Sequence, residues 1–235
     1  MPVFLLPEDL PVFPDPRRAE AEGVLAIGGG LEPARVLMAY SRGIFPWNSA
    51  DEPLTWWCPA PRMVLQLPGD LHVPRTLRKQ ARRHPLRVSL DTDFAAVLGA
   101  CASHPRPGQD GAWITPGIIT VFTALHALGM AHSVEVWDGE ALVGGLYGLA
   151  IGAVFFGESM FSRASGASKH GFVALARQLV RWEFQLVDCQ VASAHLRGLG
   201  GRELALAPFL DALAAGVRAP GRLGPWQIDP DIAGA

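Results

Sequence analysis

The sequence is poor in cysteine and in charge. Its 235 residues include only 3 cysteines, 18% of the residues are charged, and the net charge is −2. Cys58, Cys101 and Cys189 are far apart, with no CxxC pair and no Cys/His cluster, so we expect neither a disulfide framework nor a metal site. A chain that is not basic overall needs a local patch if it binds a polyanion. These features predict a protein of the reducing cytoplasm.

The sequence also lacks a targeting segment or a membrane span that we can recognise. The N-terminus has neither the cationic region nor the long apolar run of a signal peptide. The uncharged run 141–157 is shorter than a membrane span, and its glycines favour interrupted strands over a helix. Hydrophobic residues still make up 49% of the chain, which excludes a disordered protein.

Proline, glycine and tryptophan concentrate near the N-terminus. Residues 26–30 and 43–47 are typical of turns, and Pro33 suits the first turn of a short helix at 33–40. This composition predicts a small, irregular N-terminal domain, residues 1–62, which is not an independent folding unit. Residues 63–235 form the second domain.

The second domain alternates helical and strand patterns. Apolar spacing and turn residues predict helices at 74–83, 93–101, 116–129 and 204–217, and one that Ser168 caps. Strands are expected at 86–90, 132–137, 153–156 and 186–191, with another from Ala141 after a hairpin turn. This order predicts a mixed α/β (α+β) fold whose central sheet is largely antiparallel. It is similar to the order in GNAT-type acyltransferases, and the tail from Ala219 is expected to be irregular.

The first candidate site is a cationic stripe on the helix at 74–83. Its positions follow the spacing i, i+3, i+4, i+7 and i+8, which places all of them on one helix face. No acidic residue lies between Asp70 and Asp91 to neutralise them. The stripe is either a solvated helix face or a surface for phosphates, which arginine binds well. The stripe consists of Arg75, Arg78, Lys79, Arg82 and Arg83.

The second candidate site is Asp188-Cys189-Gln190 on the strand predicted at 186–191. The two-residue period of a strand places Asp188 and Gln190 on one face and Cys189 on the other. A carboxylate could hold an attacking amine or accept its proton, and an amide could orient it. A structural hydrogen-bond pair explains the same pattern. Cys189 fits a small buried residue better than a nucleophile, because no histidine is close in sequence.

Other groups admit a functional and a structural interpretation. Glu158 follows the apolar run and is either a ligand contact or a rim residue paired with an arginine. Trp47, Trp56, Trp57 and Trp113 either pack in the core or stack on a base. No GxSxG nucleophile elbow is present, and Gly28-Gly29-Gly30 lacks the rest of a GxGxxG or P-loop motif.

Taken together, these motifs resemble the bacterial leucyl/phenylalanyl-tRNA–protein transferases, from Phe13 to about Leu213. The number, order and spacing of the matching stretches make the resemblance specific. The stretches are Leu25 to Gly29, Ala39-Tyr40, Arg42 to Trp47, Trp56-Trp57, Pro61-Arg62, Trp113-Ile114, Leu125-His126, Ala131 to Glu135, Leu142 to Gly145, Gly157 to Ser162, Ser168-Lys169 and Asp188 to Gln190.

The resemblance implies an enzyme that moves Leu or Phe, and Met less well, from aminoacyl-tRNA to the N-terminus of a protein that begins with Arg or Lys. The product is marked for degradation as an N-degron. The family has a small N-terminal domain and a GNAT-like C-terminal domain, and it works in the cytoplasm without a metal or a coenzyme. Its partners are leucyl-tRNA, phenylalanyl-tRNA and the acceptor protein, with no membrane.

The resemblance also implies roles for individual residues. Asp188 and Gln190 match the proposed catalytic pair. Trp47 and Trp113 match aromatic residues that contact the terminal adenosine, and Glu158 matches a glutamate near the aminoacyl end. The apolar amino-acid pocket would include two further residues, and the cationic stripe would contact tRNA phosphates. The two pocket residues are Leu146 and Phe155.

The sequence departs from the family pattern at several positions. Gly30 stands where an acid is usual, and Phe122 where a tyrosine is usual. The turn after Asp-Cys-Gln is Gly198 to Gly201, and Ala205-Leu206 replaces a Pro-Arg pair. These changes affect the contacts that the C-terminal part of the family makes, and they leave the pair Asp188 and Gln190 intact.

Two other functions remain open. An acyl-CoA-dependent GNAT N-acetyltransferase would carry a pyrophosphate loop of the form Arg/Gln-x-x-Gly-x-Gly/Ala. The segments 163–168 and 197–202 both fail at its last position. A non-enzymatic tRNA-binding module would need the cationic stripe but not the Asp/Gln pair.

Overall fold

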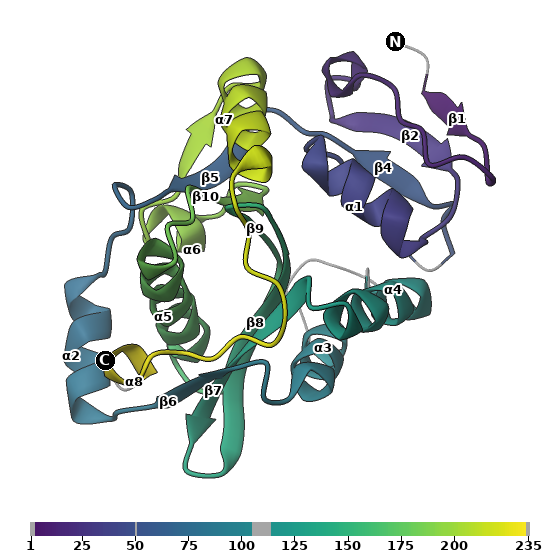
Figure 1. Cartoon of the computed structure of the whole chain (residues 1–235). Coiled ribbons are helices and arrows are strands. Elements are labelled where there is room, and N and C mark those ends of the chain that lie inside the picture. The colour runs from purple at the N-terminus through teal and green to yellow at the C-terminus, as the bar shows by residue number, and fades with distance from the viewer. Residues whose placement is uncertain (1–2, 50, 105–113, 234–235) are drawn as a thin grey trace.

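The computed structural model describes residues 3–49, 51–104 and 114–233, and Trp113 therefore lies outside the described residues. The N-terminal layer is a sheet in the order β1-β2-β4-β3, covered by helix α1 (Figure 1). Its strands are β1 (Phe4–Leu6), β2 (Val24–Gly28), β3 (Phe45–Pro46) and β4 (Thr55–Trp57). Helix α1 (Pro33–Ser41) begins at Pro33, as predicted. A short 3-10 helix, η1, covers Pro16–Arg18.

The central sheet has the strand order β11-β5-β10-β9-β8-β7-β6. All neighbours in it are antiparallel except β10 and β9, which are parallel. The predicted mixed α/β class with a largely antiparallel sheet is thus confirmed. The strands are β5 (Arg62–Gln66), β6 (Arg87–Leu90), β7 (Ala131–Asp138), β8 (Ala141–Ile151), β9 (Val154–Ser162), β10 (Leu186–Gln190) and β11 (Arg202–Leu204).

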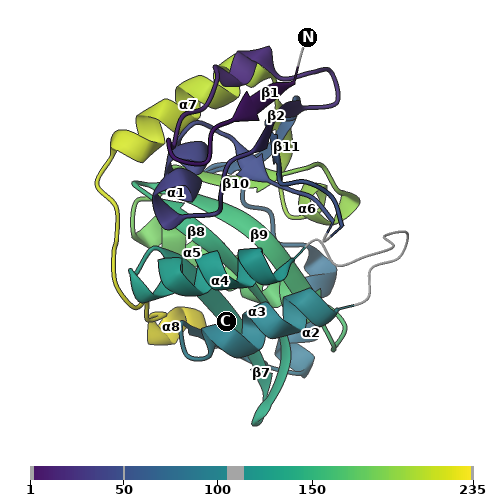
Figure 2. The same ribbon diagram turned by 90° about the vertical axis from the view of Figure 1, so that its right-hand side faces the viewer.

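Helices cover both faces of this sheet, as Figures 1 and 2 show. One face packs against α5 and α2, and the other against α3, α4, α7 and the N-terminal layer. The core on the face that packs against α3, α4, α7 and the N-terminal layer is continuous across the two predicted domains, because Tyr40 of α1 packs edge-on against Phe122 and Phe156. The helices are α2 (Arg75–Arg83), α3 (Phe94–Ser103), α4 (Pro116–Ala127), α5 (Ala167–Arg181), α6 (Ala194–Arg197), α7 (Leu206–Arg218) and α8 (Pro230–Ala233).

The segments 26–30 and 43–47, predicted as turns, contribute residues to β2 and β3, and two further local predictions need correction. The residue that caps α5 is Gly166, in a left-handed conformation with φ of 76°, and Ser168 lies inside the helix. Strand β9 continues to Ser162, beyond the predicted end at 156, because its pairing with β8 extends to Gly144. Within the described residues, no helix is long and apolar enough to span a membrane. The division at residues 62 and 63 stays a prediction.

Candidate active site

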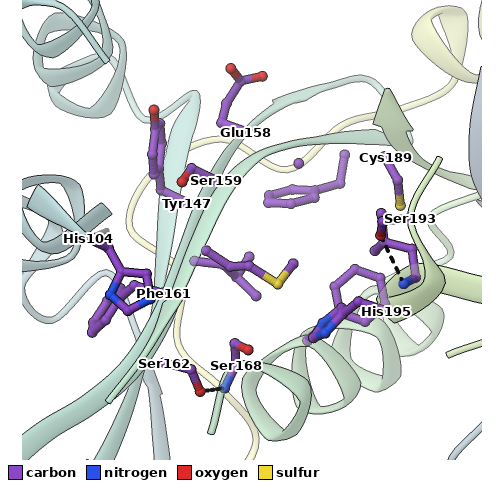
Figure 3. A pocket seen from close by; sticks show the side chains of 16 residues that line it. His104, Tyr147, Glu158, Ser159, Phe161, Ser162, Ser168, Cys189, Ser193 and His195 are labelled. Carbon is purple, nitrogen blue, oxygen red and sulfur yellow. Dashed lines mark hydrogen bonds between the residues drawn. The ribbon is translucent and has the colours of Figure 1, made fainter. Parts of the chain in front are cut away.

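A pocket opens where the two parallel strands of the central sheet separate. β9 and β10 pair only from Val154 to Phe156 and from Leu186 to Asp188. Beyond these residues β9 continues beside β8, whereas β10 bulges and ends, so the space between them is not filled by pairing. The resulting cavity has a volume of about 610 Å³ (Figure 3).

Most of the pocket wall is apolar. The two predicted pocket residues, Leu146 and Phe155, both line it and are 2% and 1% exposed. Phe172 from α5, Met160 from β9 and Leu196 from α6 extend the same wall. The walls can therefore hold a hydrophobic group, which favours burying an apolar side chain.

Asp188 lies beside the pocket rather than in its wall. Its side chain is completely buried, and its two carboxylate oxygens accept hydrogen bonds from Arg62 Nε and Nη2, both at 2.8 Å. Oδ1 also accepts the backbone N–H of Gln190 at 2.9 Å. Asp188 thus holds the bulge at the end of β10, where Gln190 has a φ of 61°. This bulge replaces the regular alternation that the sequence predicts.

Gln190 connects this buried pair to the pocket. Its side-chain Nε2 donates to Glu158 Oε1 at 2.8 Å, and Glu158 lines the cavity. Arg62, Asp188, Gln190 and Glu158 therefore form one polar chain from the buried side of the sheet to the pocket.

The carboxyl of Glu158 has an unusual environment. Burial, and the nearby charge of Asp188, raise the pKa of Glu158 to about 8. Burial and the charge of Glu158 likewise hold the pKa of Tyr40, on α1, well above its usual range. The acceptor that the family resemblance implies is an N-terminal amine, whose pKa of about 7.7–8.0 is close to that of Glu158, so the two groups could exchange a proton near pH 8.

Trp47 and the cationic stripe lie outside the pocket wall. Trp47 follows β3, is partly buried, and packs on Trp57 with ring centroids 5.5 Å apart. Helix α2 buries Leu77 against the body of the protein and exposes the whole stripe, which comprises Arg75, Arg78, Lys79, Arg82 and Arg83. The Gln80 side chain also bonds to the Ser165 carbonyl, which ties α2 to the loop before α5.

His195 is a pocket residue that sequence reasoning missed. It comes from α6, and its buried Nε2 has no hydrogen-bond partner among the described residues. Burial, and secondarily Lys169, lower the pKa of His195, which keeps its imidazole neutral. His195 lies in a short segment after β10. The sequence of this segment has no periodic pattern from which its return to the cavity could be predicted. Arg62 and Tyr40 were also missed as members of the site, although both lie in stretches that match the family.

The structure also changes the argument about Cys189. The sequence argument considered only histidines close to Cys189 along the chain, whereas in the structure Cys189 and His195 line the same pocket. Burial, and then the charge of Asp188, raise the pKa of the Cys189 thiol far above its usual range. The thiolate is the nucleophilic form, so the raised pKa disfavours Cys189 as a nucleophile, and its interpretation as a small buried residue stays a prediction.

For the aminoacyl transfer that the family resemblance implies, we expect Cys189→Ala to keep the rate within about twofold of wild type, because a thiol that stays protonated is no nucleophile. Steady-state transfer rates measure this, and iodoacetamide treatment of the wild type serves as the control. A loss of a hundredfold in Cys189→Ala would point to a covalent intermediate on sulfur.

Among the described residues, no group of three His, Cys, Asp or Glu side chains is arranged to hold a metal ion. The contacts of the site offer proton exchange at Glu158 and orientation by the Gln190 amide, next to an apolar pocket.

Comparison with known proteins shows the family of this chain. Residues 64–214 match the family model of the leucyl/phenylalanyl-tRNA protein transferase, and residues 29–60 match that of its N-terminal domain. Leucyl/phenylalanyl-tRNA–protein transferases from Anaeromyxobacter dehalogenans (strain 2CP-C) and Nitratidesulfovibrio vulgaris (strain DP4) are 51% and 50% identical to this chain. The alignments cover 97% of this chain and of the first relative, and 99% of this chain and of the second.

A solved GCN5-related N-acetyltransferase from Kribbella flavida is 15% identical, with a TM-score of 0.34 over 71% of this chain and 58% of that chain. That likeness is too weak to bear on the fold, so the GNAT comparison stays a prediction. The matches to the family define the class of the protein as an aminoacyltransferase. More particularly, the chain belongs to the leucyl/phenylalanyl-tRNA–protein transferase family.

Proposed function

We propose that the protein transfers leucine or phenylalanine, and methionine less well, from aminoacyl-tRNA to the N-terminal amine of proteins that begin with Arg or Lys. The observation that carries the proposal is the polar chain from Arg62 through Asp188 and Gln190 to Glu158, which ends beside the apolar pocket. Family membership supports the same reaction. The product is an N-degron, and the cytoplasm, where charged tRNA is found, is the expected location.

The proposed mechanism uses the activated ester of aminoacyl-tRNA and needs no ATP, metal or coenzyme. The acceptor amine attacks the ester carbonyl carbon, the new C–N bond forms, and the C–O bond to the terminal ribose breaks. The amine loses a proton, and the ribose oxygen gains one. Glu158 accepts the amine proton in the fraction of molecules in which it is ionised, since its pKa is about 8, and it passes this proton to the ribose oxygen. Gln190 orients Glu158 and the amine, and Asp188 positions Gln190 through its backbone N–H.

The aminoacyl side chain occupies the wall formed by Leu146, Phe155 and Phe172. Its hydrophobic contacts hold the ester carbonyl near Glu158. In this proposal Trp47 and Trp113 stack on the terminal adenosine of the tRNA, and the cationic stripe on α2 contacts tRNA phosphates. Stacking of a base on an aromatic ring contributes about 1–3 kcal/mol.

A direct assay tests the function. Leucine labelled with ³H is transferred from charged tRNA to a peptide that begins with Arg, and the peptide with an acetylated N-terminus is the control. We expect incorporation only into the free-amine peptide. The alternative, an acyl-CoA-dependent N-acetyltransferase, predicts transfer from labelled acetyl-CoA instead, and this outcome would contradict the proposal.

The α2 stripe leads to a prediction about salt. Arg78→Gln together with Arg82→Gln should reduce the magnitude of the log–log salt slope of tRNA affinity by about one to two units, because each phosphate contact releases counterions. The loss should be equal for leucyl- and phenylalanyl-tRNA, since phosphate contacts carry no base information. Filter binding at several salt concentrations measures the slope.

The matched control is Arg17→Gln with Arg18→Gln, which removes the same charge from exposed positions in the N-terminal layer. A short aminoacyl-adenosine, which cannot reach α2, should react equally well with the wild type and with the Arg78/Arg82 variant. Parallel losses with tRNA and with this short substrate would show that the stripe supports the fold instead.

A further inference from the structure

The C-terminal tail packs behind the pocket. After α7 it crosses the sheet and ends in α8, against α5 and β6 (Figure 1). The family match ends at residue 214, before this tail begins. Trp226 is its main anchor and is only 1% exposed. The segment is therefore part of the core, although it has little regular structure.

Trp226 is held on several sides. Its backbone N–H donates to Asp91 Oδ2 at 2.7 Å, and the same oxygen lies 2.8 Å from His132 Nδ1. The indole ring stacks on the His132 imidazole, with centroids 3.6 Å apart and planes 6° apart. The indole N–H donates to the Arg222 carbonyl at 3.1 Å. Both the backbone and the ring of Trp226 thus have a defined position.

The same indole contacts a wall of the pocket. The ring centroids of Trp226 and Phe155 are 6.0 Å apart, and Phe155 lines the cavity. On the β8 side, the Phe155 ring lies directly against the backbone of Gly148. A side chain at position 148 would clash with it, because a Cβ there would lie 2.5 Å from Phe155 Cζ. Phe155 is therefore confined between the backbone at Gly148 and the indole of Trp226.

We propose that Trp226 is a specificity-determining residue that acts through Phe155 and sets the room available to the aminoacyl side chain. The proposal rests on the function proposed above, because it assigns the pocket to that side chain. Close-packed protein interiors have low compressibility. Trp226 therefore prevents the Phe155 ring from moving away from the pocket. With a smaller residue at 226, the Phe155 ring can withdraw from the pocket, and the pocket deepens.

The test compares aminoacyl side chains on one tRNA body. The same tRNA is acylated chemically with leucine, phenylalanine or tryptophan, and kcat and KM are measured for the wild type and for Trp226→Phe and Trp226→Leu. Trp226→Phe keeps an aromatic ring over His132, so it is the milder change. We expect the ratio of kcat/KM for tryptophan to that for leucine to rise about tenfold in the variants, the scale that one methylene-sized change in a pocket produces.

The matched control is Trp182→Phe. Trp182 packs against the same indole, with centroids 5.0 Å apart, but does not line the pocket. The Trp182→Phe variant should have a lower thermal stability, with an unchanged ratio of kcat/KM for tryptophan to that for leucine.

A parallel loss for all three side chains in the Trp226 variants, or an equal shift of this ratio in Trp182→Phe, overturns the assignment. A wild type that transfers none of the three overturns the proposed function and this assignment together, whereas an active wild type with an unshifted ratio in the variants overturns only the assignment.

Discussion

Replacing Asp188 with asparagine is expected to lower transfer by about a hundredfold or more, since small displacements of catalytic groups have effects of this size. The same change should destabilise the fold by about 3–5 kcal/mol, because it leaves the buried Arg62 guanidinium without its counter-charge. Binding of tRNA should change little, since the proposed phosphate contacts lie on α2 and the pair lies on β5 and β10. Transfer rates, filter binding and urea unfolding measure the three effects separately. Gln190→Ala should have a milder effect on transfer.

A double variant separates stability from catalysis. Arg62→Met with Asp188→Leu replaces the buried ion pair by apolar side chains, a change that is often neutral or stabilising in other proteins. We therefore expect the double variant to recover most of the lost stability. Transfer should stay low, because the Gln190 N–H loses the carboxylate that accepts it at 2.9 Å. Recovery of activity along with stability would mean that Asp188 and Arg62 only support the fold.

Glu158→Gln is the second change with a large expected effect. It should reduce transfer strongly, because an amide cannot accept the amine proton. The same variant should be more stable than wild type at pH 8, although the two should be nearly equal at pH 4. The reason is that burial raises the pKa of Glu158 to about 8 in the folded state, whereas in the unfolded chain it is about 4.3.

The direction in which the stability of the wild type changes with pH follows from these two pKa values of Glu158. Between them the folded protein keeps the Glu158 proton and the unfolded chain has lost it, so the stability of the wild type falls as pH rises from about 4 to 8. One pKa unit corresponds to about 1.4 kcal/mol, so the advantage of Glu158→Gln should grow to a few kcal/mol. Urea unfolding at several pH values measures it and involves no acceptor amine.

Glu140→Gln is the matched control, because Glu140 is exposed in the turn between β7 and β8. Its stability relative to wild type should not change over the same pH range. If Glu158→Gln also shows no pH dependence, then Glu158 has an ordinary pKa. Its role as proton acceptor would then lose its physical basis. Equal transfer by Glu158→Gln and wild type would remove Glu158 from the site.

The sequence predicted those elements whose pattern is local. Helices α2, α4 and α7 and strands β6, β7 and β10 lie within a few residues of their predicted positions. The apolar spacing, Pro33 and Pro116 at helix starts, and the Asp138-Gly139 turn carry this information within short windows. The short strands β5 and β11 were missed, because each is stabilised by partners far away in the chain.

The candidate site divides in the same way. The sequence alone determined the chemistry-bearing residue types: Asp188 and Gln190 in one strand, Glu158 after an apolar run, and the cations of α2 on one helix face. Only the tertiary structure joined Asp188 to Arg62, 126 positions away, and Gln190 to Glu158, 32 positions away. It also placed Tyr40, His195 and Trp226 around or behind the pocket. Helix and strand periodicity depends on residues that are neighbours along the chain. Ion pairs, raised pKa values and cavities depend instead on which distant segments pack together and keep water out.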